Sequence, residues 1–196
     1  MSGKIDVCNV AISRIGQTQI TSLSEDDKKA RLCGVFFDHL RDALLEDNWW
    51  TFATKRQTLA LLTETPDSEY NYFYQIPTDC ITPRYVVNQI AYQIEGDKLA
   101  TDSTDDIELV YTFRETDVTK FSPQFRDLLA YKLALELVIP ITKDLDMRDR
   151  IEQDYMMAKT RYSQVDKRKG RRLITKSRNW RQGTNIETEW WKIPNG

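Results

Sequence analysis

The sequence predicts an α+β protein: a helical bundle of about four helices, an inserted antiparallel β domain and an extended C-terminal arm. Apolar residues recur at helical spacing near both ends of the chain. The segment between them is rich in Tyr, Val, Ile and Thr, alternates in hydropathy and is broken by prolines. The predicted parts are a bundle from residues 1–54 and 120–168, a β domain at 55–119 and a basic arm at 169–196.

Length and composition limit the class of protein. A chain of 196 residues can bury a core of its own. It contains no apolar run near the ~18 residues that a membrane span needs. The first residues also lack a basic segment followed by an apolar signal-peptide core. We therefore expect a protein that folds in a cytoplasm and has no membrane partner.

Charge is divided along the chain. The formal net charge is −2. Residues 167–196 hold nine Lys or Arg and two Glu, a net of +7, which leaves −9 for residues 1–166. The sequence therefore predicts an acidic body with a basic tail.

Two helices are predicted in the first 47 residues. The first carries apolar residues at helical spacing from Ile5 to Ile15 and ends at Gly16. For the second, Ser24 is the predicted N-cap, with Asp27 three positions later. Its predicted apolar face is formed by Cys33, Phe36, Phe37, Leu40 and Leu44.

The β domain is predicted to be antiparallel. Gly96 supplies the turn of a hairpin within residues 92–101. The last strand alternates, so one of its faces is predicted to carry Ile107, Leu109, Tyr111 and Phe113.

Two further helices are predicted after the β domain. Ser122 is the predicted N-cap of the third and Pro123 its first residue. Because residues 125–139 are apolar nearly all round, this helix is either the centre of the bundle or covered on its second face by a neighbouring subunit. Leu133 and Leu137 are its candidate residues for a domain joint or a subunit interface. The fourth helix has an apolar stripe made of Ile151, Tyr155, Ala158, Tyr162 and Val165.

No catalytic constellation is found in the sequence. Cys8, Cys33 and Cys80 cannot all pair within one chain, and we expect buried free thiols. The single histidine, His39, is expected to be partly buried and hydrogen-bonded on a helix. We expect no catalytic residue, cofactor or metal. An acid pair drawn from Glu64, Asp67 and Glu69 leaves a glycosidase as an alternative, since that chemistry needs two carboxylates beside a sugar.

Two tryptophan-rich stretches are candidate contact sites. Trp49, Trp50 and Phe52 lie where the helical pattern gives way to the alternating one, and are typical of a domain joint, a partner site or a sugar platform. The tail combines eight basic residues in 167–181 with Trp180 and later tryptophans. That composition suits docking to a protein, contact with nucleic acid, or a solvated tail. The candidate arm residues are Arg171, Arg172, Lys176, Arg178, Trp180, Arg181, Trp190 and Trp191.

Four strings occur in one order along the chain. They are "AISRIG…ITSLSEDDKKARLCGVFFDHLRDALLEDNWWTFA" with "KRQTLAL", then "YFYQIPTDCITPRYV", "LVYTFRETDVTKFSPQFRDLLAYKLALEL" and "MMAKTRYSQVD". In these strings and their order, residues 4 to about 168 resemble the head-to-tail adaptor of short-tailed bacteriophages, the family often called tail tubular protein A. The tail beyond Gly170 departs from the family pattern, since it is more basic and richer in tryptophan.

The resemblance implies a structural virion protein without enzymatic activity. Twelve copies would form a ring below the portal and connect it to the tail nozzle, around the channel through which DNA passes without sequence-specific binding. The protein would be made in the host cytoplasm and act at the head-tail junction of the virion. The arm would grip the portal, and Trp49, Trp50 and Phe52 would lock the bundle onto the β domain. The alternatives are a nucleic-acid-binding protein acting through its tail and a glycan-degrading tail component.

Overall fold

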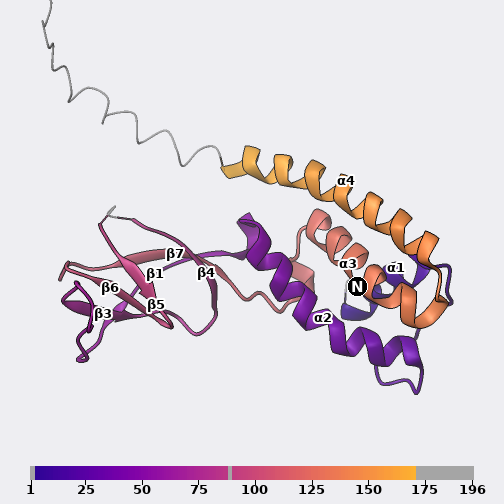
Figure 1. Ribbon diagram of the computed structural model, residues 1–196, viewed down its shortest axis with the longest axis horizontal. Coiled ribbons are helices and arrows are strands. Elements are labelled where there is room, and N and C mark those ends of the chain that lie inside the picture. Colours follow the sequence, from indigo (N-terminus) through magenta and orange to yellow (C-terminus); the bar gives the residue numbers. More distant parts are fainter. Residues whose placement is uncertain (1–2, 88–89, 171–196) are drawn as a thin grey trace, which may run out of the picture.

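The molecule is elongated, with helices at one end and strands at the other (Figure 1). The computed structural model describes residues 3–87 and 90–170, with side chains as far as Tyr162. Within them the chain forms four α-helices and two antiparallel sheets, which confirms the predicted α+β class. The last helix runs to Gly170, so residues 169–170 are helical; the remainder of the predicted arm lies outside the described residues.

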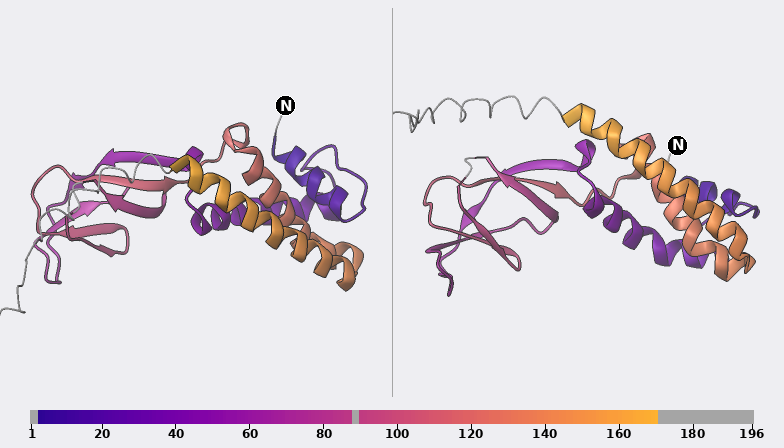
Figure 2. Two further views of the ribbon diagram at one scale, coloured as in Figure 1. Left: turned by 90° about the horizontal axis from the view of Figure 1, so that it is seen from above. Right: turned by 45° about the horizontal axis from the view of Figure 1, so that its top comes forward.

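The helices form a bundle centred on α3. They are α1 (Lys4–Arg14), α2 (Lys28–Asp47), α3 (Pro123–Thr142) and α4 (Leu145–Gly170). Helix α3 packs against each of the other three, and both views in Figure 2 show α4 running along it. The predicted start of α3 is confirmed, because the Ser122 hydroxyl accepts a hydrogen bond from the Phe125 amide and Pro123 is the first helical residue.

The predicted start of the second helix is wrong by three residues. Helix α2 begins at Lys28 and its N-cap is Asp27, whose carboxylate accepts a hydrogen bond from the Lys29 amide at 2.6 Å. Ser24 lies in the preceding turn, where its amide donates to the Ser22 hydroxyl. Asp and Ser are both favourable N-caps. The local hydrogen bonds of residues 21–25 favour a turn over a further helical turn.

The strands form two sheets, and a single residue separates β1 of one sheet from β2 of the other. The elements are η1 (Thr51–Ala53), β1 (Thr54–Thr58), β2 (Ala60–Leu61), β3 (Tyr72–Gln75), β4 (Cys80–Val86), β5 (Gln93–Glu95), β6 (Lys98–Thr101), β7 (Glu108–Phe113) and η2 (Val118–Lys120). Their orders are β1-β7-β4 and β2-β3-β6-β5. Leu59 separates β1 from β2 and donates its amide to Ile107, whereas Leu62 donates to Phe73. Because alternate residues of a strand point their amides to opposite sides, β7 and β3 lie on opposite sides of this segment.

The predicted hairpin is confirmed, and the last strand has buried residues on both of its faces. Strands β5 and β6 pair around Gly96, whose φ of +64° is the left-handed conformation that favours glycine. In β7, Leu109 and Tyr111 are buried as predicted, but Val110 and Thr112 on the other face are buried too. Leu109 and Tyr111 belong to the core of the sheets, and on the other face the Arg84 side chain contacts the Thr112 hydroxyl.

Each end of the molecule has its own hydrophobic core. The cluster in the helices includes Cys8, Phe37, Leu129 and Leu137. The cluster in the sheets is formed by Leu59, Tyr74, Ile76, Val86, Leu99, Ile107, Leu109 and Tyr111. Phe113, at the end of β7, packs against both clusters. Residues 48–54 and 113–122 carry the chain between the two ends, and the candidate site lies there.

Candidate functional site

The two adjacent tryptophans point into different environments. Trp50 is 2% exposed and its indole N–H donates to the backbone carbonyl of Leu44 at 2.8 Å. Trp49 is 42% exposed and its indole N–H donates to the Thr54 hydroxyl, also at 2.8 Å. Asn48 and Trp50 both have extended backbone conformations, in which successive side chains alternate in direction. One tryptophan therefore enters the bundle while the other stays at the surface.

Trp50 and Phe52 belong to a cluster of four aromatic rings. The Trp50 and Phe125 centroids are 5.1 Å apart in an edge-to-face arrangement, and the Phe52 and Phe125 centroids are also 5.1 Å apart. Phe121 completes the cluster, 4.9 Å from Phe125. Such pairs add ~0.5–1.5 kcal/mol each beyond the area they bury. The cluster fixes the segment after α2 to the start of α3.

Trp49 contacts the β side of the junction. Its ring lies 5.8 Å from that of Tyr85 on β4, and the Arg84 guanidinium lies 6.0 Å from it. The three aromatic residues predicted as one joint are thus divided: Trp50 and Phe52 pack in the bundle core, and Trp49 contacts β4. A sugar platform formed by both tryptophans is excluded, because Trp50 is buried.

Leu133 and Leu137 do not lie on a surface that another subunit could reach. Both are 0% exposed within a single chain, in the core around which α1, α2 and α4 pack. Of the two alternatives for the apolar helix, the centre of the bundle is therefore the one observed. The placement of these two residues at a subunit interface is wrong, because helices of the same chain already cover the faces that carry them.

Arg84 joins β4 to the C-terminal end of α2. Its guanidinium donates to the Asn48 carbonyl at 2.9 Å, to the Leu45 carbonyl at 3.4 Å and to the Thr112 hydroxyl at 2.7 Å. A cation at this end satisfies carbonyls that have no partner within the helix. Burial lowers the pKa of this guanidinium. Arg84 thus caps α2 from another part of the fold.

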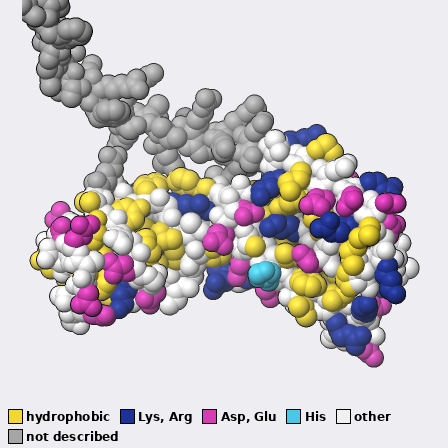
Figure 3. All heavy atoms as spheres, viewed as in Figure 1, with side chains coloured by type: hydrophobic (Ala, Val, Ile, Leu, Met, Phe, Trp, Pro, Cys, Tyr) yellow, Lys and Arg dark blue, Asp and Glu magenta, His cyan; other side chains and the backbone are white. Residues whose placement is uncertain are grey.

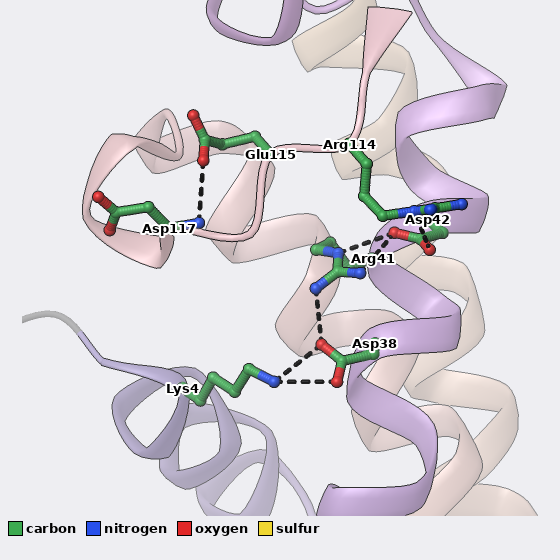
Figure 4. A network of polar contacts seen from close by, with 7 residues as sticks. All are labelled: Lys4, Asp38, Arg41, Asp42, Arg114, Glu115 and Asp117. Carbon is green, nitrogen blue, oxygen red and sulfur yellow. Dashed lines mark hydrogen bonds and ion pairs between the residues drawn. The ribbon is translucent and has the colours of Figure 1, made fainter. Parts of the chain in front are cut away.

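A chain of ion pairs runs along α2 beside the junction (Figure 4). The buried Arg41 contacts Asp38 at 2.6 Å and Asp42 at 2.7 Å. Lys4 of α1 pairs with Asp38 at 2.8 Å, and Arg114, just after β7, pairs with Asp42 at 3.0 Å. The pairs therefore connect α1 and the end of β7 through α2. Arg114 is exposed, and an exposed ion pair contributes only ~0–1 kcal/mol.

Asp47, at the end of α2, is held by two lysines of its own chain. Lys159 of α4 lies 3.1 Å from its carboxylate and Lys132 of α3 lies 3.5 Å from it. Burial would raise the pKa of this carboxyl, but the hydrogen bond from Lys159 and the charge of Lys132 outweigh it and lower the pKa. These contacts offset the unfavourable position of an acid at a helix C-terminus.

The three acids considered for catalysis lie on the loop between β2 and β3. Glu64 is exposed and pairs with Lys98 at 2.6 Å, while Asp67 and Glu69 are exposed on the same loop. A hollow of about 460 Å³ lies elsewhere, on α1 beside Asn9 and Arg14. The glycosidase alternative gains no support from this arrangement.

Thiols and the histidine differ in part from expectation. Cys8 and Cys33 are buried free thiols as predicted, but Cys80 is half-buried. The prediction of a partly buried His39 is wrong: it is exposed on α2 (cyan in Figure 3). Among the described residues, no group of three or more His, Cys, Asp or Glu could hold a metal ion.

The arm residues from Arg171 onward lie outside the described residues, so their predicted role stays a prediction. Sequence reasoning missed Arg84, Arg114 and Phe121. An apolar residue just before an N-cap often packs on the first turns of the helix, so Phe121 beside the predicted cap Ser122 was a usable signal for the aromatic cluster. The two arginines gave no such signal, because their partners are tens of residues away along the chain.

Comparison with protein-family models and with curated proteins found no match for the chain. In the described part of the chain, no helix is both long and apolar enough to cross a membrane.

Proposed function

We propose that the protein is a structural adaptor at the head-to-tail junction of a short-tailed bacteriophage. Twelve copies form a ring beneath the portal and connect it to the tail nozzle around the DNA channel. The observation that carries the proposal is the order of parts: two helices, a β unit on a buried aromatic junction, two more helices, and a basic segment after the last one.

The division of charge supports the roles of the parts. A body with net charge −9 over residues 1–166 would repel DNA from the channel wall. A tail of net charge +7 with three tryptophans suits capture of an acidic protein surface, in which arginines steer the encounter and tryptophans fill pockets. The bundle forms the ring and the β unit is the distal docking face. The chemistry is assembly, with no catalytic step.

A chain ending at Gly170 tests the role of the tail. We expect this chain to unfold at the same midpoint temperature as the full chain and to lose binding to portal rings. Two full-length variants separate the contribution of the basic residues to portal binding from that of the tryptophans. Replacing Arg171, Arg172 and Lys176 by Gln should lower the association rate, and replacing Trp180, Trp190 and Trp191 by Ala should raise the dissociation rate. Full portal binding by the shortened chain would contradict the proposal.

Contact with nucleic acid through the tail is the second candidate. Eight basic residues and no acidic one lie in residues 167–181, which would neutralise phosphates and release counterions. This candidate requires the isolated protein to bind DNA with an affinity that falls steeply as salt rises. The chain ending at Gly170 is the matched control, since it keeps the body and Lys167, Arg168 and Lys169 but lacks the other five of these basic residues.

A further inference from the structure

The helical and β ends of the molecule meet over a small, partly polar junction. The chain enters the sheets just after Ala53, which is buried in the bundle core, and leaves them at Phe113. Contacts across the junction include Phe113 between the two cores, Trp49 on Tyr85, and the two arginines Arg84 and Arg114. Small polar interfaces between two separately packed units allow relative motion.

The two arginines hold the same stretch of α2 in different ways. Arg84 makes three part-buried hydrogen bonds, two of them to backbone carbonyls at the end of the helix. Breaking them would leave part-buried carbonyls without donors, and salt screens such contacts less than exposed ones. Arg84 therefore acts as a fixed point.

The Arg114 contact is of the opposite kind. Its side chain is 46% exposed, and its single partner among the described residues is the Asp42 carboxylate, which is 31% exposed. Both groups reach water directly, so ions compete for them and salt weakens the pair. Asp42 keeps its bond to the buried Arg41 when Arg114 leaves, so opening creates no unpaired buried charge (Figure 4).

We propose that Arg84 is the pivot and the Arg114–Asp42 pair a salt-sensitive latch of a hinge between the bundle and the β unit. When the latch opens, the β unit changes its angle to α2 while Arg84 keeps its place at the end of the helix. The inference does not depend on the adaptor proposal, because it rests only on contacts within one chain.

A distance measurement between the two ends tests the hinge. Ketone-bearing residues placed at the exposed positions Gln153 on α4 and Asp67 on the β2–β3 loop accept spin labels and leave the three cysteines unchanged. The distance distribution is measured by pulsed electron paramagnetic resonance at about 0.02 M and about 0.5 M salt. We expect it to be narrow at low salt and broader at high salt in the otherwise unchanged chain.

Variants identify the latch. In the Arg114→Gln chain the distance distribution should be broad at both salt concentrations, so that it no longer depends on salt. In the Arg114→Lys chain the salt dependence should return. Arg148→Gln is the matched control: Arg148 is 42% exposed and pairs with Glu152 on α4, away from the junction, so the salt dependence should stay. The proposal would be overturned if the distance distribution of the parent chain did not change with salt. It would also be overturned if the distribution of a folded Arg114→Gln chain were narrow at both salt concentrations.

Discussion

Trp50 and Leu44 are joined by a hydrogen bond from the indole N–H to the backbone carbonyl, across 2.8 Å, and both residues are buried in the bundle core. The bond spans the end of α2, so it fixes the direction in which the chain leaves the helix. The aromatic contact of Trp50 with Phe125 then ties that exit to α3. The β unit is thereby placed relative to the bundle by a side chain that belongs to neither sheet.

Removing Trp50 should destabilise the protein far more than removing its neighbour. Trp50→Ala empties a buried aromatic site and should lower the free energy of unfolding by ~3–5 kcal/mol. Trp49→Ala removes a ring that is 42% exposed, and should cost about 1 kcal/mol. Urea unfolding followed by circular dichroism measures both. Equal losses would contradict the division of the two rings between core and surface.

The true N-cap of α2 can be distinguished from the one that the sequence suggested. Asp27→Ala removes the acceptor of the Lys29 amide and should cost ~1 kcal/mol. Ser24→Ala changes an exposed residue of the preceding turn and should stay within ~0.5 kcal/mol of the parent. Thermal or urea unfolding gives both values. A larger loss from Ser24→Ala would place the start of the helix earlier than Lys28.

Asp47 should contribute stability that depends on pH in a defined direction. Its pKa is lowered in the folded state, mainly because the two lysines outweigh the effect of burial. The contribution is therefore complete above the ordinary pKa of about 4 and is lost as pH falls through the lower folded value. The difference in unfolding free energy between the parent and Asp47→Asn should shrink toward low pH. Glu46→Gln, which removes an exposed acid on the same turn, is the control for the loss of one negative charge there.

Cys80 should be the one thiol that reacts in the folded protein, and slowly. Burial and the neighbouring Asp79 raise the pKa of this thiol to about 11, whereas Cys8 and Cys33 are fully buried. Its reaction with a maleimide at pH 8 should be on the order of 100-fold slower than that of a free thiol. Mass spectrometry should find at most one label on the native chain and three in denaturant. Rapid labelling of Cys8 or Cys33 would contradict the packing of α1 on α2.

Residues that cap a helix or form a turn predicted those elements whose ends depend only on neighbouring residues. The Ser122–Pro123 pair identified the start of α3, and Gly96 identified the hairpin, because each is a short-range requirement of the backbone. The start of α2 was misplaced since Ser24 and Asp27 are both acceptable caps, and the choice between them depends on hydrogen bonds within the turn.

Features set by distant residues were not predictable from pattern alone. The burial of Thr112 follows from contact with Arg84 on the neighbouring strand. The packing of α3 against three helices of the same chain could not be distinguished from packing against another subunit, because the apolar pattern is the same in both cases. The candidate site could be predicted only in part. The sequence shows its two tryptophans as an adjacent pair. The opposite directions of their side chains, and the contacts of the two arginines, depend on the fold.

Native mass determination of the purified protein, alone and then mixed with its cognate portal ring, tests the adaptor proposal most directly. The account predicts a monomer or a ring when alone, and a complex of defined stoichiometry, with about twelve copies per ring if the symmetry is that of the resembling family. A monomer that ignores the portal ring and instead binds DNA with steep salt dependence would contradict the account and assign the function to the basic tail.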